Sequence, residues 1–152
     1  MCERRNRMTT QINQPIKDFK VVTQEQAQPA PEPIERPEVL DSTTYKIKTN
    51  DVSFYITLSD TIINGELRPY EMFISTKSVE HTPYLTCITR LISAFFRTGY
   101  DYSFIAQELK QIHDAKDGNY FKRGVNYPSL IAEIGYLLEK HFTQIAEKNR
   151  TK

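Results

Sequence analysis

The fold is decided by the stretch His81-Thr-Pro-Tyr-Leu-Thr-Cys-Ile-Thr-Arg-Leu-Ile-Ser-Ala-Phe-Phe-Arg-Thr-Gly99. It predicts a helix over residues 83–98, in which Pro83 takes the first position and Thr82 caps the unpaired amides of the first turn. Gly99 is placed to take the left-handed conformation that ends a helix. Apolar residues recur at helical spacing and should face a core. They are Leu85, Ile88, Leu91, Ile92, Phe95 and Phe96.

Upstream of this helix, apolar and polar residues alternate with the period of a strand over residues 44–49, 52–59 and 68–76. Asn50-Asp51 forms the first turn, and Asn64-Gly65 is the hairpin signal before the last strand. Such short connections favour antiparallel pairing, so we expect a three-stranded meander. The side chains predicted to face inward are Tyr45, Ile47, Thr49, Val52, Phe54, Ile56, Leu58, Tyr70, Met72 and Ile74.

Downstream, the pattern predicts a second and a third helix separated by an irregular connector over residues 114–126. Asp101 or Ser103 caps the second helix, whose apolar side is formed by Phe104, Ile105, Leu109 and Ile112. Ser129 caps the third, which carries Leu130, Ile131, Ile134, Leu137, Leu138 and Ile145 and frays over residues 147–152. The expected fold is therefore α+β, a three-stranded antiparallel sheet followed by three helices packed on one face.

Composition bounds the organisation of the chain. Residues 1–35 are rich in Pro and Gln and predict a disordered leader, which leaves one domain at residues 36–146. A net charge of +1 argues against a protein that coats DNA. No apolar run approaches the length of a membrane span, and the N-terminus has no apolar signal core, so we expect a cytoplasmic location and no membrane contact.

The sequence holds no pattern that indicates catalysis, a cofactor or a metal. Cys2 and Cys87 are too few for a disulfide framework or a zinc site, and Cys87 is interpreted as a small buried residue. The histidines, His81, His113 and His141, lack partners at metal-ligand spacing and are interpreted as structural or solvated. The carboxylates near the second hairpin, Asp60, Glu66 and Glu71, are interpreted as surface charge.

The outward face of the sheet is the first candidate binding surface. Lys46, Lys48, Tyr55 and Phe73 should all project from it. Aromatic rings flanked by lysines can stack bases and hold phosphates of single-stranded nucleic acid. The same features suit a homodimer or another protein interface, where aromatic anchors are enriched. Both interpretations stay open, and we favour the homodimer or partner contact.

Two further groups of residues are candidates for partner contact. The connector places Tyr120 and Phe121 beside Lys122 and Arg123, which suits a phosphate or a protein partner. On the helix of residues 83–98, Arg90 and Arg97 fall outside the apolar face and are expected to meet a partner.

Several separated blocks resemble one known family. They are Arg36-Pro-Glu-Val-Leu40, Thr44-Tyr-Lys-Ile-Lys-Thr49, Arg68-Pro-Tyr-Glu-Met-Phe-Ile-Ser75, Thr89-Arg-Leu-Ile-Ser-Ala-Phe-Phe-Arg-Thr-Gly99 and Tyr127-Pro-Ser-Leu-Ile-Ala-Glu-Ile-Gly135. In this order they resemble the TSCPD domain, found at the C-terminus of adenosylcobalamin-dependent (class II) ribonucleotide reductases and in short stand-alone proteins of bacteria and phages. The resemblance covers residues 36–142, nearly the whole predicted domain.

The resemblance implies a role in nucleotide metabolism but not the reductase chemistry. The family motif places a cysteine before its proline and an aspartate after it, whereas Tyr127 and Ser129 flank Pro128 here. The radical-generating barrel, its active-site cysteines and the cobalamin site lie outside the region of resemblance. We therefore expect a non-catalytic accessory module that contacts a ribonucleotide reductase or another protein of nucleotide metabolism. The alternatives are a nucleic-acid-binding protein and a nucleotide-sensing regulator.

Overall fold

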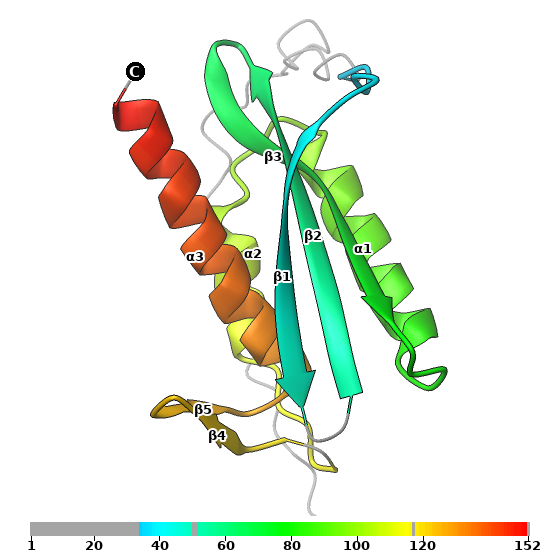
Figure 1. Ribbon diagram of the computed structural model, residues 1–152. Coiled ribbons are helices and arrows are strands. Elements are labelled where there is room, and N and C mark those ends of the chain that lie inside the picture. Colours follow the sequence, from blue (N-terminus) through cyan, green and yellow to red (C-terminus); the bar gives the residue numbers. More distant parts are fainter. Residues whose placement is uncertain (1–33, 50–51, 117, 152) are drawn as a thin grey trace, which may run out of the picture. The chain divides into compact units, whose positions relative to one another are not determined.

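The computed structural model describes residues 34–49, 52–116 and 118–151. Its sheet has three antiparallel strands in the order β1-β2-β3, namely β1 (Asp41–Thr49), β2 (Val52–Ile63) and β3 (Glu66–Thr76). The helices α1 (Thr82–Phe96), α2 (Ser103–Lys110) and α3 (Leu130–Arg150) lie on one side of it (Figure 1). The predicted α+β meander with three helices on one face is confirmed. The predicted leader lies outside the described residues except for its last two positions, and the Asn50-Asp51 turn lies outside them altogether.

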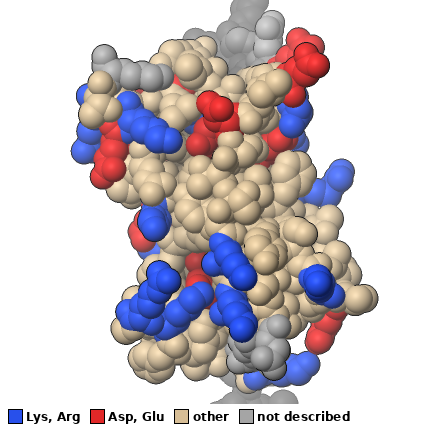
Figure 2. All heavy atoms as spheres, in the orientation of Figure 1, with Lys and Arg blue, Asp and Glu red and all other residues tan. Residues whose placement is uncertain are grey.

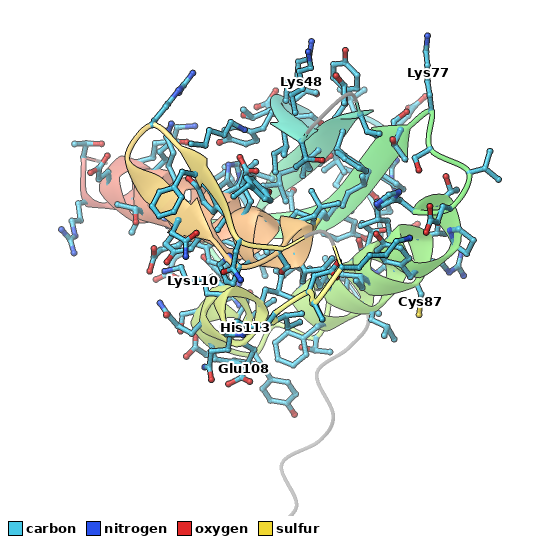
Figure 3. All side chains as sticks on the ribbon, turned by 90° about the horizontal axis from the view of Figure 1, so that it is seen from below. Lys48, Lys77, Cys87, Glu108, Lys110 and His113 are labelled. Atoms are coloured by element: carbon cyan, nitrogen blue, oxygen red, sulfur yellow. The ribbon has the colours of Figure 1, made fainter. Side chains whose placement is uncertain are left out.

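The core lies between the sheet and the helices. Strand β2 contributes Phe54, Ile56 and Leu58, which are fully buried, as their alternation predicts. They meet buried side chains of all three helices, namely Leu85, Ile92, Phe96, Ile105, Ala106, Ile134 and Leu138. Helices α1 and α3 pack on β3, and α2 packs on α3. The opposite face of the sheet carries no helix among the described residues (Figure 3).

The β2–β3 hairpin forms at the predicted signal and contains an irregularity that the sequence did not predict. Asn64 and Gly65 take φ values of 51° and 84°, as a two-residue hairpin turn requires. Further along, the register shifts between Ser59 and Asp60, so that Tyr70 is an extra residue on β3. The bulge interrupts strict alternation, and residues 69–72 are buried in succession.

Helix α1 keeps its predicted stop but differs at its start and on one face. Gly99 has a φ of 77° just after the helix, as expected. His81 occupies the N-cap position without a side-chain cap, while Thr82 Oγ1 donates to the Ser78 carbonyl at 2.7 Å. The prediction that Thr82 caps the helix was therefore wrong. Leu91 was also predicted to face the core, but 67% of its surface is exposed.

Other predictions of burial and length are corrected. Cys87 is exposed on the outer side of α1 and points away from the sheet, because it lies on the face opposite the core stripe (Figure 3). In α2, Phe104 is exposed, and Ile105 packs in the core together with Ala106. Ile112, predicted for the apolar side of this helix, lies beyond its end at Lys110 and is exposed. Helix α3 continues to Arg150, so residues 147–150 are helical rather than frayed.

The connector before α3 contains a small hairpin that the sequence did not predict. Strands β4 (Tyr120–Lys122) and β5 (Val125–Tyr127) pair antiparallel around the turn Arg123-Gly124. After it, Ser129 caps α3 as predicted, because its Oγ accepts the Ala132 amide at 2.9 Å.

Gly135 allows α2 and α3 to approach closely. A Cβ at this buried position would lie 2.8 Å from the Ala106 carbonyl oxygen and 2.9 Å from the Lys110 amide nitrogen, both backbone atoms of α2. Such separations are closer than real contacts allow, so the missing side chain sets the distance between the two helices. Hairpin β4–β5 lies between these helices in the sequence.

Candidate functional site

The open sheet face carries the first predicted group. The register sets Lys46 opposite Tyr55 and Thr57 opposite Phe73, so these residues share one face with Lys48, which points away from the helices (Figure 3). Lys46 Nζ lies 5.5 Å from the centre of the Tyr55 ring, a cation–π contact. Because the lysine occupies part of that ring, the face offers a poorer platform for stacking bases than the sequence suggested.

A groove between β3 and α1 brings together predicted residues from two elements. It has a volume of 640 Å³, and its lining includes Phe73, Arg90, Leu91 and Arg97. Phe73 is 56% exposed and Leu91 67%. We call this surface the β3–α1 groove. The Arg97 guanidinium lies 5.9 Å from the centre of the buried Tyr70 ring, a cation–π contact.

The outer edge of β3 is closed beside this groove by a helix side chain. Ser93 Oγ, on α1, accepts the Met72 amide at 2.9 Å and donates to the Met72 carbonyl at 3.1 Å. A single hydroxyl thus takes the place of a neighbouring strand for one residue of β3. This bond also fixes α1 against the sheet, and with it Arg90 and Leu91.

The second predicted group lies in a cleft between β1, hairpin β4–β5 and α3. The cleft has a volume of 260 Å³ and is lined by four cationic side chains, Lys46, Lys122, Arg123 and Lys140, with Tyr45, Ile47, Tyr127, Glu133, Tyr136 and Leu137. We call it the basic cleft. In Figure 2, Lys and Arg side chains gather in the lower half of the view, the end where β1 finishes beside the hairpin.

A buried carboxylate organises one wall of the basic cleft. Glu133 accepts hydrogen bonds from the Tyr120 hydroxyl at 2.6 Å and from Lys122 Nζ at 2.5 Å. The pKa of Tyr120 is raised well above its ordinary value, mainly by burial and to a lesser extent by the Glu133 carboxylate. The phenol therefore stays protonated and donates its hydrogen bond to Glu133. Of the predicted connector residues, Lys122 and Arg123 therefore line the cleft, Tyr120 supports it, and Phe121 is 78% exposed.

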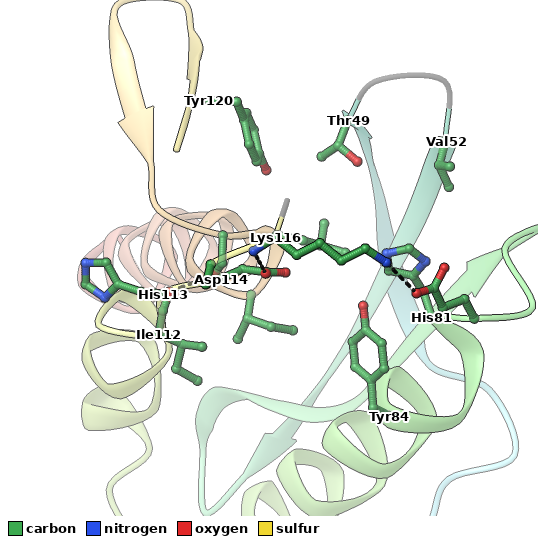
Figure 4. Close-up of a pocket in the computed structure, with 14 residues that line it drawn as sticks. Thr49, Val52, His81, Tyr84, Ile112, His113, Asp114, Lys116 and Tyr120 are labelled. Atoms are coloured by element: carbon green, nitrogen blue, oxygen red, sulfur yellow. Dashed lines mark hydrogen bonds and ion pairs between the residues drawn. The ribbon is translucent and has the colours of Figure 1, made fainter. Parts of the chain in front are cut away.

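A pocket of 450 Å³ opens between α1, the end of the β1–β2 hairpin and the connector (Figure 4). His81 and His113 both line it, from opposite sides (Figure 4). His81 Nδ1 is hydrogen-bonded to Ser78 Oγ at 2.5 Å, and the His81 ring packs edge-on against Phe54. The role of His81 is therefore structural, as interpreted from the sequence. Lys116 reaches across the pocket to Glu80 at 3.3 Å, and both of these side chains are exposed.

A buried polar network joins the sheet to α3, and the sequence interpretation missed it. His141 Nε2 lies 2.9 Å from Asp60 Oδ1, and its Nδ1 lies 2.9 Å from the Tyr45 hydroxyl, which also donates to Gln144. Burial, with a smaller contribution from Asp60, raises the pKa of Tyr45. Two signals were available: Asp60 continues the inward alternation of β2, and His141 continues the apolar stripe of α3.

The interpretation of the hairpin carboxylates as surface charge was wrong for Asp60 and Glu71, which are buried. Glu71 is paired with Arg36, whose Nη2 lies 2.8 Å from a carboxylate oxygen, and this pairing raises the pKa of Arg36. Glu66 is exposed, as interpreted. Within the described ranges, no group of three or more His, Cys, Asp or Glu side chains is placed to hold a metal ion.

Comparison with known proteins assigns the family. A family model described as the TSCPD domain matches residues 24–142. The chain belongs to the TSCPD domain family. This domain is found in ribonucleotide reductases. No curated protein and no solved structure matches the chain. In the part of the chain that the structure describes, no helix has the length and apolar character needed to cross a membrane.

The structure explains one departure of this TSCPD domain from its family motif. Ser129, which stands where the motif has aspartate, is the N-cap of α3, and its hydroxyl also donates to the Ile112 carbonyl at 2.6 Å. Aspartate and serine are both preferred N-caps, so the exchange keeps the structural role. Tyr127, in the place of the cysteine, instead packs edge-on against Tyr136 at 5.3 Å in the wall of the basic cleft.

Proposed function

We propose that this TSCPD domain protein is a non-catalytic docking module of nucleotide metabolism that binds a ribonucleotide reductase through the β3–α1 groove. The observation that carries the proposal is the pair of exposed apolar side chains, Phe73 and Leu91, which line that groove together with Arg90 and Arg97. The family supplies the class of partner, because TSCPD domains occur in ribonucleotide reductases.

The chemistry of the groove supports binding to a protein. Aromatic and arginine side chains carry much of the energy of protein interfaces when they sit in a groove with apolar neighbours. Phe73 and Leu91 offer the apolar contact, and Arg90 and Arg97 can each bind a carboxylate with two parallel hydrogen bonds. The complementary surface on the partner is therefore an apolar segment flanked by Asp or Glu.

The bonded backbone of Met72, which lines the groove, supports side-chain docking over strand addition. Partners that add a strand to a sheet need unpaired amides and carbonyls along its edge. Ser93 already bonds both backbone groups of Met72. A partner in the groove would therefore contact side chains, and its affinity would depend on Phe73 and Leu91.

The residues at the family motif support a role without catalysis. A thiol at the motif would lie at position 127, where this protein has a tyrosine held between Tyr120 and Tyr136. A phenol whose pKa is raised by burial, as that of Tyr127 is, is a poor nucleophile at neutral pH.

Titration calorimetry of the full chain against the purified ribonucleotide reductase of the same organism tests the proposal. Leu91→Glu places a charge in the groove and should weaken binding at least about thirtyfold, the usual cost of losing a central anchor. Ile62→Glu is the matched control, because Ile62 is 60% exposed and does not line the groove. The affinity of the Ile62→Glu variant for the reductase should equal that of the unaltered protein.

Three results would count against the proposal. The first is no binding to the reductase, and the second is equal weakening by Leu91→Glu and Ile62→Glu. The third is a self-association, measured by sedimentation, that Leu91→Glu abolishes while reductase binding stays intact. That result would assign the groove to a second copy of the chain.

A further inference from the structure

The basic cleft holds more positive charge than its own contacts neutralise. Against its four cations stands one carboxylate, that of Glu133, which is already bonded to Lys122. Among the described residues, Lys46, Arg123 and Lys140 form no ion pair. Because the whole chain carries a net charge of only +1, this concentration is local and favours an anion at this position.

The turn of hairpin β4–β5 gives a second, independent observation. Arg123 and Gly124 are its two central residues, with φ values of 53° and 80°. A turn with two positive φ values prefers Asn or Gly at its first position, and a long side chain there is strained. The β2–β3 hairpin of the same chain obeys this preference with Asn64. Arginine at position 123 thus costs stability, as residues held for function often do.

Three separate elements contribute cationic side chains to the lining of the cleft. Lys46 comes from β1, Arg123 from the hairpin turn, and Lys140 from α3. The Lys46 ammonium lies over the Tyr55 ring, and Lys122 is bonded to Glu133, so Arg123 and Lys140 are placed to meet an anion in the cleft. Residues converging from distant parts of the chain on a concave surface resemble a binding site more than a solvated charged face. The rings of Tyr127 and Tyr136 line the same cleft and pack edge-on against each other, and Lys110 Nζ lies 4.7 Å from the centre of the Tyr136 ring. We call this pair of rings the tyrosine wall.

We propose that the basic cleft binds a nucleoside polyphosphate, with its phosphates held by Arg123 and Lys140 and its base beside the tyrosine wall. Linked phosphates match several cations placed around one cavity, and the planar arginine fork suits phosphate oxygens. A volume of 260 Å³ is below the range of about 300 to 1,000 Å³ that small-molecule pockets usually have, so the cleft has room for part of one mononucleotide rather than for a polymer strand. This site is separate from the β3–α1 groove, so it stands independently of the docking proposal.

Titration calorimetry of the full chain with ATP in low-salt buffer tests the assignment. Arg123→Asn and Lys140→Gln should each weaken binding at least about tenfold, the usual cost of one hydrogen bond to a charged group. Lys148→Gln is the matched control, because Lys148 is an exposed lysine of α3 outside the cleft. Asparagine suits the turn better than arginine, so the melting temperature of Arg123→Asn should be equal or higher, which separates lost binding from lost folding.

Two parallel titrations fix the class of ligand. A short oligothymidine should bind more weakly than ATP, and inorganic triphosphate should also bind more weakly, because it lacks a base for the tyrosine wall. No binding of ATP, or binding that Arg123→Asn and Lys140→Gln leave unchanged, would overturn the proposal. Tighter binding of oligothymidine than of ATP would overturn it in favour of nucleic acid, and equal binding of inorganic triphosphate would overturn the role of the tyrosines.

Discussion

Replacing Gly135 by alanine sets two effects of opposite sign against each other. In an open helix, alanine would stabilise α3 by about 1 kcal/mol over glycine. Here the new Cβ would lie 2.8 Å and 2.9 Å from backbone atoms of α2, and 3.0 Å from Leu109 Cβ. Backbone atoms cannot rotate away, so α2 must shift, and overpacking of this kind costs about 1 to 3 kcal/mol. We expect a net loss of roughly 1 kcal/mol.

Urea unfolding followed by circular dichroism measures this loss. With an unfolding slope of about 2 kcal/mol per M, the midpoint should fall by about 0.5 M. Thr143→Ala is the control, since Thr143 is exposed on the same helix and its replacement raises helix propensity without entering the α2–α3 contact. Its midpoint should rise slightly. A midpoint for Gly135→Ala above that of the unaltered protein would refute the reasoning, because it would mean that the two helices separate at no cost.

Three further predictions concern stability. The pKa of Tyr120 is raised in the folded state, so the stability that this protonated phenol contributes is complete below the ordinary tyrosine pKa of about 10 and is lost as the pH rises above it. Tyr120→Phe should therefore reduce the loss of stability at high pH, measured by urea midpoints between pH 8 and 11. Ser93→Ala should cost about 1 to 3 kcal/mol and speed hydrogen exchange of the Met72 amide, because both backbone groups of that residue lose their partner. His141→Leu should cost roughly 3 kcal/mol by leaving the buried Asp60 carboxylate unpaired, and adding Asp60→Leu should recover part of that loss.

The periodic elements of this protein were predictable because burial on one face leaves a clear pattern. The alternation of Phe54, Ile56 and Leu58 in β2 predicted their complete burial. The Asn64-Gly65 pair predicted the turn between β2 and β3, because its residue types accept positive φ. Helix α1 was also predictable in its extent, although exposed Leu91 cannot be distinguished from a core residue by spacing alone.

What the sequence did not predict depends on contacts between distant segments. Hairpin β4–β5 was missed because its turn begins with Arg123, a residue that gives no turn signal. Asp60 and Glu71 look like surface charges until their partners, His141 and Arg36, are known. The basic cleft combines Lys46 with the hairpin, and nothing in the local pattern places those segments together.

The outer edge of β3 is bonded by side chains of two helices, which links aggregation to helix docking. Ser93 of α1 bonds Met72, and Asn149 of α3 bonds both the amide and the carbonyl of Leu67, at 2.9 Å and 3.0 Å. An exposed strand edge is a template for intermolecular pairing. Met72 is released only when α1 leaves the sheet, and Leu67 only when the last turn of α3 does. The species that pairs through this edge should therefore be a partly unfolded chain with a detached helix, and the rate of pairing through β3 should report how often that happens.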